Sequence, residues 1–100
     1  MIIRGTTPTH TWILPFESSL VKEARVIYAQ NDKPMITKQT ADCSIGEDKI
    51  SVTLTQEETF LLNCDYYAEV QLRVLTIDGG VYNTPVRVEG VGKCLDSEVL

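Results

Sequence analysis

Residues 66–76 read YYAEVQLRVLT, and this stretch constrains the fold more than any other part of the chain. Apolar residues occupy every second position from Ala68 to Val74, and polar residues lie between them. This period of two is what a β-strand with one buried face requires. The Asp-Gly-Gly turn at 78–80 supplies positive φ angles, and the extended pattern restarts at Val81 and Tyr82. We therefore predict a central strand that forms a hairpin with the next strand.

Further short alternating segments lie between turn signals along the whole chain. Strands are predicted at 10–16, 22–30, 35–38, 49–54, 66–76, 81–82 and 86–91, with a short extended segment around 43–45. Asn-Asp-Lys-Pro at 31–34 forms a turn between two of these strands. Thr55 and Glu58 have the spacing of a capping box, which predicts one or two helical turns crossing from one sheet to the other.

Each alternating segment also predicts which residues face the core. One face of the first strand carries Trp12, the largest side chain available to the core, together with His10, Leu14 and Phe16. The equivalent residues of the other strands are Ala24, Val26 and Tyr28, and Ile50, Val52 and Leu54. Near the end of the chain, Val86 and Val88 lie on the face opposite Arg87 and Glu89, while Gly90 and Gly92 indicate a bulge or a close approach.

About seven short strands without a long helical period predict an all-β fold, an immunoglobulin-like antiparallel β-sandwich with one short helical crossover. A small closed barrel is the alternative. Trp12 precedes all three cysteines, so the cysteine–tryptophan–cysteine order of immunoglobulin domains is absent and any likeness is architectural. One hundred residues predict a single domain, 1–100. Within it we expect residues 1–8 to form an extended arm, along the sheet or on a neighbouring subunit, and residues 96–100 a mobile tail.

Charge and composition argue against several classes of function. A net charge of -5 with scattered basic residues disfavours nucleic-acid binding, which depends on clustered lysine and arginine. Membrane spans need about 20 apolar residues and signal peptides need a shorter apolar run, and neither pattern is present. We therefore expect a soluble protein that is not exported by the usual route. Cys43, Cys64 and Cys94 have no CxxC pair, so we expect reduced thiols rather than a zinc site or disulfides.

The sequence contains no arrangement typical of catalysis. His10 is the only histidine, and an active site built on it would need a pocket where it meets an acid and a hydroxyl. Neighbouring carboxylates at 47–48 and 57–58 fit turn and capping positions. Gly79 and Gly80 precede a strand, whereas a phosphate-binding loop must open a helix. We predict no catalytic, cofactor-binding or metal-binding residue, and no enzymatic activity.

Binding through a surface is the better prediction. A small sandwich has at least two edge strands, whose free amides and carbonyls invite pairing with another chain. Exposed aromatic and aliphatic side chains supply anchors for such contacts. The interface candidates are Tyr66, Tyr67, Leu75, Ile77 and Tyr82.

Four segments resemble small proteins encoded by phages and prophages of Gram-positive bacteria such as Clostridia. They are RGTTPTHTWILPF (4–16), VKEARVIYAQNDK (21–33), ISVTLTQEET (50–59) and VQLRVLTIDGGVYNTPVRVEGVGKCL (70–95). The chain is also similar, more distantly, to the N-terminal β-sandwich domain of the siphophage baseplate upper protein. In that domain a strand ending in LTxEET precedes a strand with an alternating QxRV segment and a DG turn.

The resemblance implies a non-catalytic β-sandwich component of the virion, associated with the tail or baseplate, that acts by assembling with other chains. It implies other phage structural proteins and further copies of this chain as partners, no nucleic acid or membrane, no cofactor, and assembly in the host cytoplasm. The longer fibre-forming and receptor-binding regions of a baseplate protein have no counterpart here. The alternative is a small carbohydrate-binding module, in which Tyr66, Tyr67 or Tyr82 would line a concave surface with Trp12.

Overall fold

β-Strands form 49% of the chain and helices 11% in the computed structural model, which describes all residues from 1 to 100. The five strands of the larger antiparallel sheet are β4 (Lys33–Lys38), β3 (Val21–Gln30), β7 (Ala68–Thr76), β8 (Val81–Asn83) and β9 (Arg87–Glu89). β8 and β9 follow one another along the same side of β7. The smaller antiparallel sheet has the order β2 (Thr9–Ile13), β6 (Lys49–Thr53), β5 (Cys43–Gly46). A parallel pair joins β1 (Ile2–Ile3) to β10 (Val91–Gly92).

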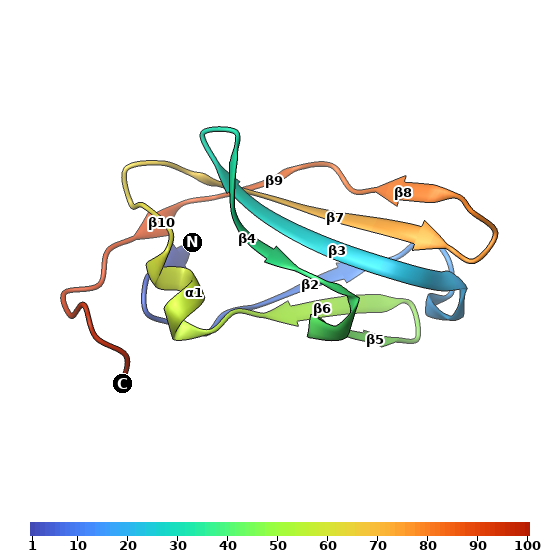
Figure 1. Cartoon of the computed structure of the whole chain (residues 1–100), viewed down its shortest axis with the longest axis horizontal. Coiled ribbons are helices and arrows are strands. Elements are labelled where there is room, and N and C mark those ends of the chain that lie inside the picture. Colours follow the sequence, from blue (N-terminus) through green and yellow to red (C-terminus); the bar gives the residue numbers. More distant parts are fainter.

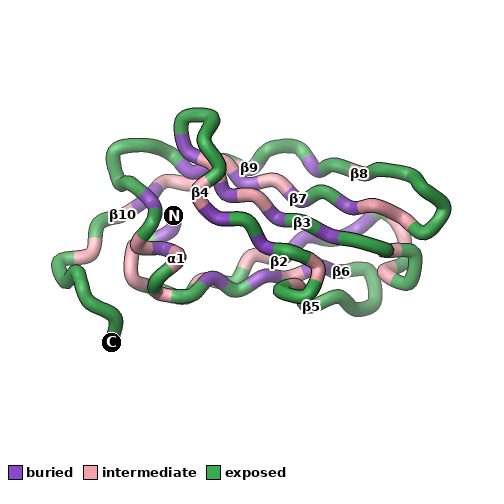
Figure 2. Tube along the Cα trace, viewed as in Figure 1, coloured by how far each residue is buried: buried purple, intermediate pink, exposed green.

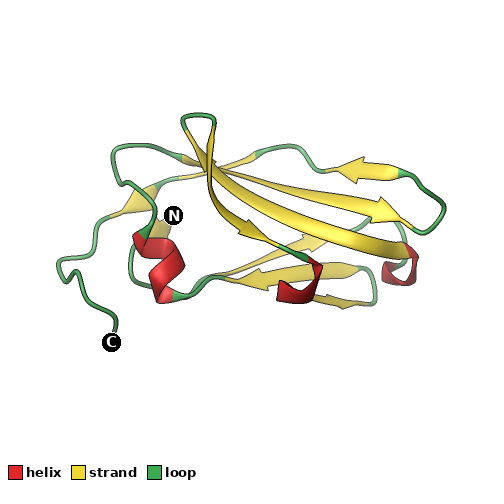
Figure 3. Ribbon diagram, in the orientation of Figure 1, coloured by secondary structure: helices red, strands yellow, loops and turns green.

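The two larger sheets lie one above the other, as Figure 1 shows. α1 (Gln56–Phe60) closes the end of the molecule where both termini lie, and two 3-10 turns, Ser18–Leu20 and Thr40–Asp42, lie toward the other end (Figure 3). The buried residues lie mainly between the sheets, while loops and outer faces are exposed (Figure 2). The predicted all-β class is thus confirmed, with antiparallel sheets and one short helix.

The central strand and its hairpin are confirmed. β7 begins at Ala68 rather than Tyr66, pairs with β3 on one side and with β8 and β9 on the other, and buries every second residue from Ala68 to Val74. Gly79 has a φ of 89°, a conformation that glycine adopts without a steric cost, so it allows the chain to reverse between β7 and β8.

The predicted inward faces of the other long strands are also confirmed. The core comprises Ile2, Trp12, Leu14, Ala24, Val26, Tyr28, Ile36, Ile50, Val52, Leu54, Leu62, Ala68, Val70, Leu72, Val74 and Val91. Phe16 and Tyr82 are half-buried against this cluster, and their rings meet edge to face with centroids 5.5 Å apart. The first strand ends at Ile13, earlier than predicted, because the chain turns before Pro15, which has no amide to donate.

The capping box at the start of α1 is formed as predicted. The Thr55 hydroxyl accepts a hydrogen bond from the Glu58 amide at 3.1 Å, and the Glu58 carboxylate accepts one from the Thr55 amide at 2.9 Å. The same carboxylate oxygen lies 2.7 Å from the Lys38 ammonium of β4. α1 leads from β6 in the smaller sheet to β7 in the larger one, so the predicted crossover is confirmed, and the ion pair ties it to the edge of the larger sheet.

The turn after β3 is tighter than predicted. Asn31 and Asp32 have φ angles of 52° and 63°, so these two residues alone reverse the chain and β4 begins at Lys33 instead of Met35. Asparagine and aspartate tolerate this left-handed conformation better than most residues, which suits a two-residue hairpin turn. Pro34 then lies within an edge strand, where its missing amide proton costs no sheet hydrogen bond.

The segment 1–8 packs on its own chain, where β1 pairs with β10. The Ile2 amide donates to the Gly90 carbonyl at 2.7 Å, the Arg4 amide donates to the Gly92 carbonyl at 3.0 Å, and the Ile2 side chain is fully buried. A Cβ atom at Gly92 would overlap the Ile3 side chain, so Gly92 meets a side chain of β1 at close range, whereas the sequence predicted a bulge or a close backbone approach. The predicted strand over 86–91 is split at Gly90 into β9 and β10, because the chain leaves β7 at this point to pair with β1.

Candidate interaction surface

An apolar strip follows the last two strands of the larger sheet. It consists of Ile77, Val81, Val86 and Val88, whose exposed fractions are 63%, 61%, 48% and 60%, and we call it the outer edge. β8 is the last strand of the sheet, and β9 pairs only with β7, so both present a free row of backbone groups on the other side. Exposed apolar side chains beside unpaired strand groups favour pairing with another strand.

The register of the sheet explains why these valines face outward. Val81 lies opposite Leu75, and Val88 lies opposite Glu69, both on the face of β7 that points away from the core. Because successive side chains alternate between faces, the charged residues Arg87 and Glu89 point inward. The guanidinium carbon of Arg87 lies 4.9 Å from the centre of the Trp12 ring, a cation–π contact. β9 therefore turns its two charged side chains inward, where they are half-buried, and exposes Val88.

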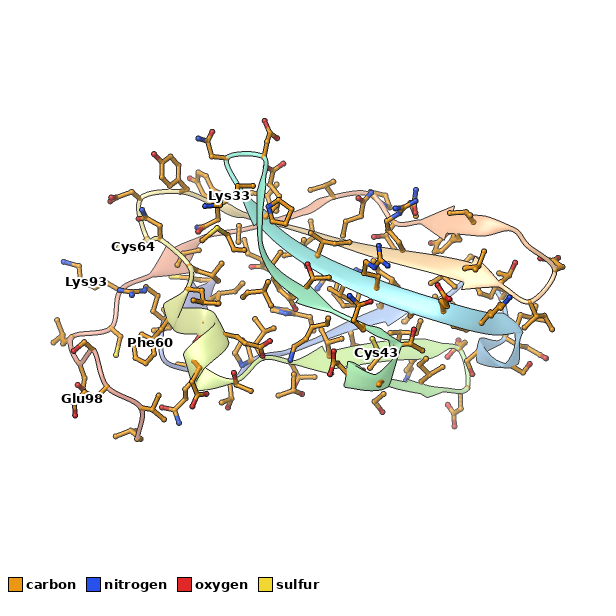
Figure 4. All side chains as sticks on the ribbon, viewed as in Figure 1. Lys33, Cys43, Phe60, Cys64, Lys93 and Glu98 are labelled. Atoms are coloured by element: carbon orange, nitrogen blue, oxygen red, sulfur yellow. The ribbon has the colours of Figure 1, made fainter.

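The opposite edge of the same sheet has different properties. β4 carries Lys33 and Pro34 at its exposed start, and Figure 4 shows Lys33 just below the turn of the hairpin. Lysine and proline on an edge strand are common devices against unwanted strand pairing. The contrast between the two edges singles out the outer edge as the candidate for a specific contact.

The five predicted interface residues do not form one surface. Tyr66 and Tyr67 are exposed in the loop before β7, whereas Leu75 is half-buried near its end and Ile77 is exposed just after it. Seven strand residues, 68–74, separate the two groups, which corresponds to about 26 Å. Tyr82 faces inward against Phe16. Sequence analysis missed Val81, Val86 and Val88, although the hairpin register around the glycine turn would have placed Val81 opposite Leu75.

Trp12 does not contribute to an aromatic platform. Its side chain is 6% exposed, is covered by Arg87, and has no tyrosine beside it on the surface. The surface on which the sugar-binding alternative depends, with Trp12 and a tyrosine side by side, is therefore not formed.

His10 belongs to a polar cluster beneath β9. Its Nδ1 atom lies 2.6 Å from the Tyr28 hydroxyl, and the ring planes are tilted with centroids 5.5 Å apart. Burial lowers the pKa of His10 below 6.5, while the nearby Glu89 carboxylate opposes this and Arg87 adds to it. Burial also raises the pKa of Tyr28. Tyr28 is fully buried, so its hydroxyl supports the histidine from within the core and is closed to a substrate.

We expect His10 to make the folded protein less stable in mild acid. In the unfolded chain the imidazole gains its proton near pH 6.5, but in the folded chain it resists protonation, so the free energy of unfolding should fall as the pH drops below about 6.5. His10 is the only histidine, so this loss should disappear in a His10→Gln variant. Urea unfolding of both proteins at intervals from pH 7.5 to 5 measures it, and equal slopes would contradict the assignment.

A hollow of about 480 Å³ lies on the outward face of the larger sheet, beside the outer edge. Arg25 of β3 and Arg73 of β7 are directly opposite each other across this face, and both line the hollow. Arg73 donates through Nε to the Asn83 side chain at 3.0 Å. The two ion pairs of the structure, Met1 with Glu89 and Lys38 with Glu58, involve neither arginine.

Arg25→Gln should raise the free energy of unfolding by about 0.5 kcal/mol, because like charges directly opposite each other in a sheet are destabilising. The gain should shrink as salt is added, since screening weakens the repulsion between the two guanidinium groups. Urea unfolding in low and high salt measures both effects. A variant that is less stable than the parent at low salt would show that Arg25 has a favourable partner.

The structure holds no group of three or more histidine, cysteine, aspartate and glutamate side chains arranged to bind a metal ion. Cys43, Cys64 and Cys94 are free thiols. None of the helices has both the length and the apolar character needed to cross a bilayer. Comparison of the chain with protein-family models, curated proteins and solved structures found no match.

Proposed function

We propose that this protein is a non-catalytic structural or accessory component of a phage, associated with the tail or baseplate or another part of the virion. It acts by assembling with other chains through the outer edge. The observation that carries the proposal is the exposed apolar strip along unpaired strands, on a sheet whose other edge is protected. The proposed location in the virion rests on the resemblance to phage and prophage proteins that we drew from the sequence of residues 4–16, 21–33, 50–59 and 70–95.

We also propose that the fold is an immunoglobulin-like sandwich. In that fold, strands B, E and D pair in one sheet, and strands C, F and G in the other, with an additional C′ strand in variable-type domains. The order β2-β6-β5 matches the first sheet, and β4-β3-β7 with β8 and β9 matches the second. The parallel pairing of β1 with β10 fits a first strand that joins the last one.

Two copies that pair along the outer edge would continue the sheet from one protomer into the next. Such pairing covers Val81, Val86 and Val88 and gives the free backbone groups of β8 and β9 new partners. A stable contact of this kind should bury at least about 1,000 Å² in total. The same edge offers a second phage protein the same kind of partner surface.

Replacing Val88 with lysine tests the proposal. The exposed side chain makes little contribution to the fold, so the variant should stay folded, while a charge on the outer edge should weaken self-association by about tenfold or more. Light scattering over a range of concentrations should show the parent larger than a monomer and the variant shifted toward a monomer. Thr37→Lys places the same charge on exposed β4 and should leave association unchanged.

A parent protein that stays monomeric at high concentration would overturn self-association through the outer edge. Membership of the virion needs a separate measurement, mass spectrometry of purified particles. If the protein is absent from the purified particles, its proposed location in the virion is wrong.

A further inference from the structure

We propose that the hollow between Arg25 and Arg73 binds Asp96 and Glu98 of a second copy, which gives the protein a head-to-tail contact besides its outer edge. This inference rests on the proposed assembly and names a second surface for it. The site consists of two guanidinium groups on an exposed sheet face and an apolar floor formed by Leu75 and Val81.

The charge of the hollow favours an anionic ligand. The charged residues that line the hollow are Arg25, Arg73 and Glu23. The hollow is therefore positive, although the net charge of the protein is -5. Arginine matches a carboxylate with two parallel hydrogen bonds, and Arg25 and Arg73 present two such groups side by side. A bound carboxylate would also relieve the repulsion between them.

The chain contains one segment with the complementary chemistry. Residues 95–100 read LDSEVL, in which two acids on either side of a serine lie between apolar residues. Leu95 and Leu100 are almost completely exposed, at 98% and 101%. Within this segment, the Leu100 amide donates a hydrogen bond to the Gln56 side chain, and the Glu98 amide donates one to the Asp96 carboxylate. Its acids fit the arginines, and its apolar residues fit the floor of the hollow.

The segment of the same molecule cannot reach the hollow. Glu98 lies beyond Phe60, at the end of the molecule opposite the β7–β8 turn, as Figure 4 and Figure 1 show. The long dimension of the molecule is 46 Å, whereas six extended residues span at most about 20 Å. The acids must therefore come from another copy, and repeated contacts of this kind generate a ring of subunits if the rotation closes and an open chain if it does not.

A peptide titration tests the site directly. The full-length Val88→Lys protein, in which the outer edge is blocked, is labelled with ¹⁵N and titrated with an octapeptide of residues 93–100 carrying serine in place of Cys94. The Nε–H signals of Arg25 and Arg73 should shift to saturation. A control peptide with Asp96→Asn and Glu98→Gln should bind at least about tenfold more weakly, because the charge-assisted hydrogen bonds are lost.

Two results would overturn the proposal. One is an absence of shifts with the acidic peptide, or equal shifts with the neutral one. The other is equal binding of inorganic phosphate at matched ionic strength, which would identify a site for free anions instead. Val81 borders both surfaces, but Val88 lines only the outer edge, so the titration of the Val88→Lys protein reports on the hollow alone, and failure of the outer edge and failure of this site give different results.

Charge exchange provides a second readout. On the Val88→Lys background, Arg25→Glu with Arg73→Glu should abolish the remaining concentration-dependent association, as should Asp96→Lys with Glu98→Lys. A mixture of these two variants should associate again, because each supplies the charge that the other has lost. If the mixture stays as monomeric as its components, the head-to-tail contact is wrong. Circular dichroism of each variant shows whether it is folded.

Discussion

Replacing Gln30 with methionine should lower the free energy of unfolding by about 3 kcal/mol, although the two side chains have similar size and shape. The Gln30 side chain is 4% exposed and makes three hydrogen bonds to the backbone of the loop before β7. Nε2 donates to the carbonyls of Asn63 at 2.7 Å and Tyr66 at 3.1 Å, and Oε1 accepts from the Asn63 amide at 2.8 Å. Methionine leaves all three backbone groups without these partners.

A matched control is Gln71→Met, which removes a single side-chain hydrogen bond, to the Thr84 carbonyl, from a half-buried position. It should cost about 1 kcal/mol. Urea unfolding compares the two variants, and hydrogen exchange of the loop amides shows whether residues 63–66 open more often in Gln30→Met. Equal costs for the two variants would mean that the loop holds its shape without Gln30.

Replacing Glu58 with alanine should cost about 3 kcal/mol through two separate losses. The capping box loses the half that the Glu58 side chain supplies, its hydrogen bond from the Thr55 amide, and the Lys38 ammonium, whose side chain is 11% exposed, loses its carboxylate. Glu57→Ala is the control, because Glu57 lies in the same helical turn but is exposed. Thermal and urea unfolding measure both, and a Glu58 variant no less stable than the Glu57 variant would contradict the argument.

Glu58→Gln separates the two losses, because glutamine can still cap the helix but carries no charge. The pH dependence gives an independent check. Burial by itself raises the pKa of Glu58, but hydrogen bonds from Lys38 and Thr55 outweigh it and hold the pKa below 4.5. The stabilisation is therefore complete above about pH 4.5 and is lost as the pH falls through the lowered pKa. The parent should lose stability more steeply than Glu58→Gln in that range.

The parts of the fold that sequence analysis predicted correctly depend on near neighbours in the chain. The inward face of β7 follows from alternation alone, since one set of its residues is apolar and the other polar. The start of α1 follows from Thr55 and Glu58, which interact across three residues. Such short-range patterns have the same meaning wherever the segment lies.

The remaining features depend on contacts between distant residues. At residues 86–89 the alternation places Val86 and Val88 on one face of the chain and Arg87 and Glu89 on the other. Because apolar side chains usually face the core, the sequence pattern by itself would bury the valines. The register with β7 and the Trp12 ring beneath Arg87 reverse this choice, and neither is visible from the local sequence. By contrast, the separation of Tyr66 from Leu75 follows from the predicted strand 66–76. The hairpin register that places Val81 opposite Leu75 also places Tyr82 opposite the inward-facing Val74.

The parallel pairing of β1 with β10 has a consequence for the order of folding events. The contact between Met1 and Glu89 beside this pair joins residues 88 positions apart, so forming it early would close nearly the whole chain into one loop before other contacts compensate the lost entropy. The local hairpins close much shorter loops and therefore lose less chain entropy. Docking of Ile2 therefore belongs after the transition state, where it slows unfolding without accelerating folding. β1 therefore slows the unfolding of a domain that the other strands have already assembled.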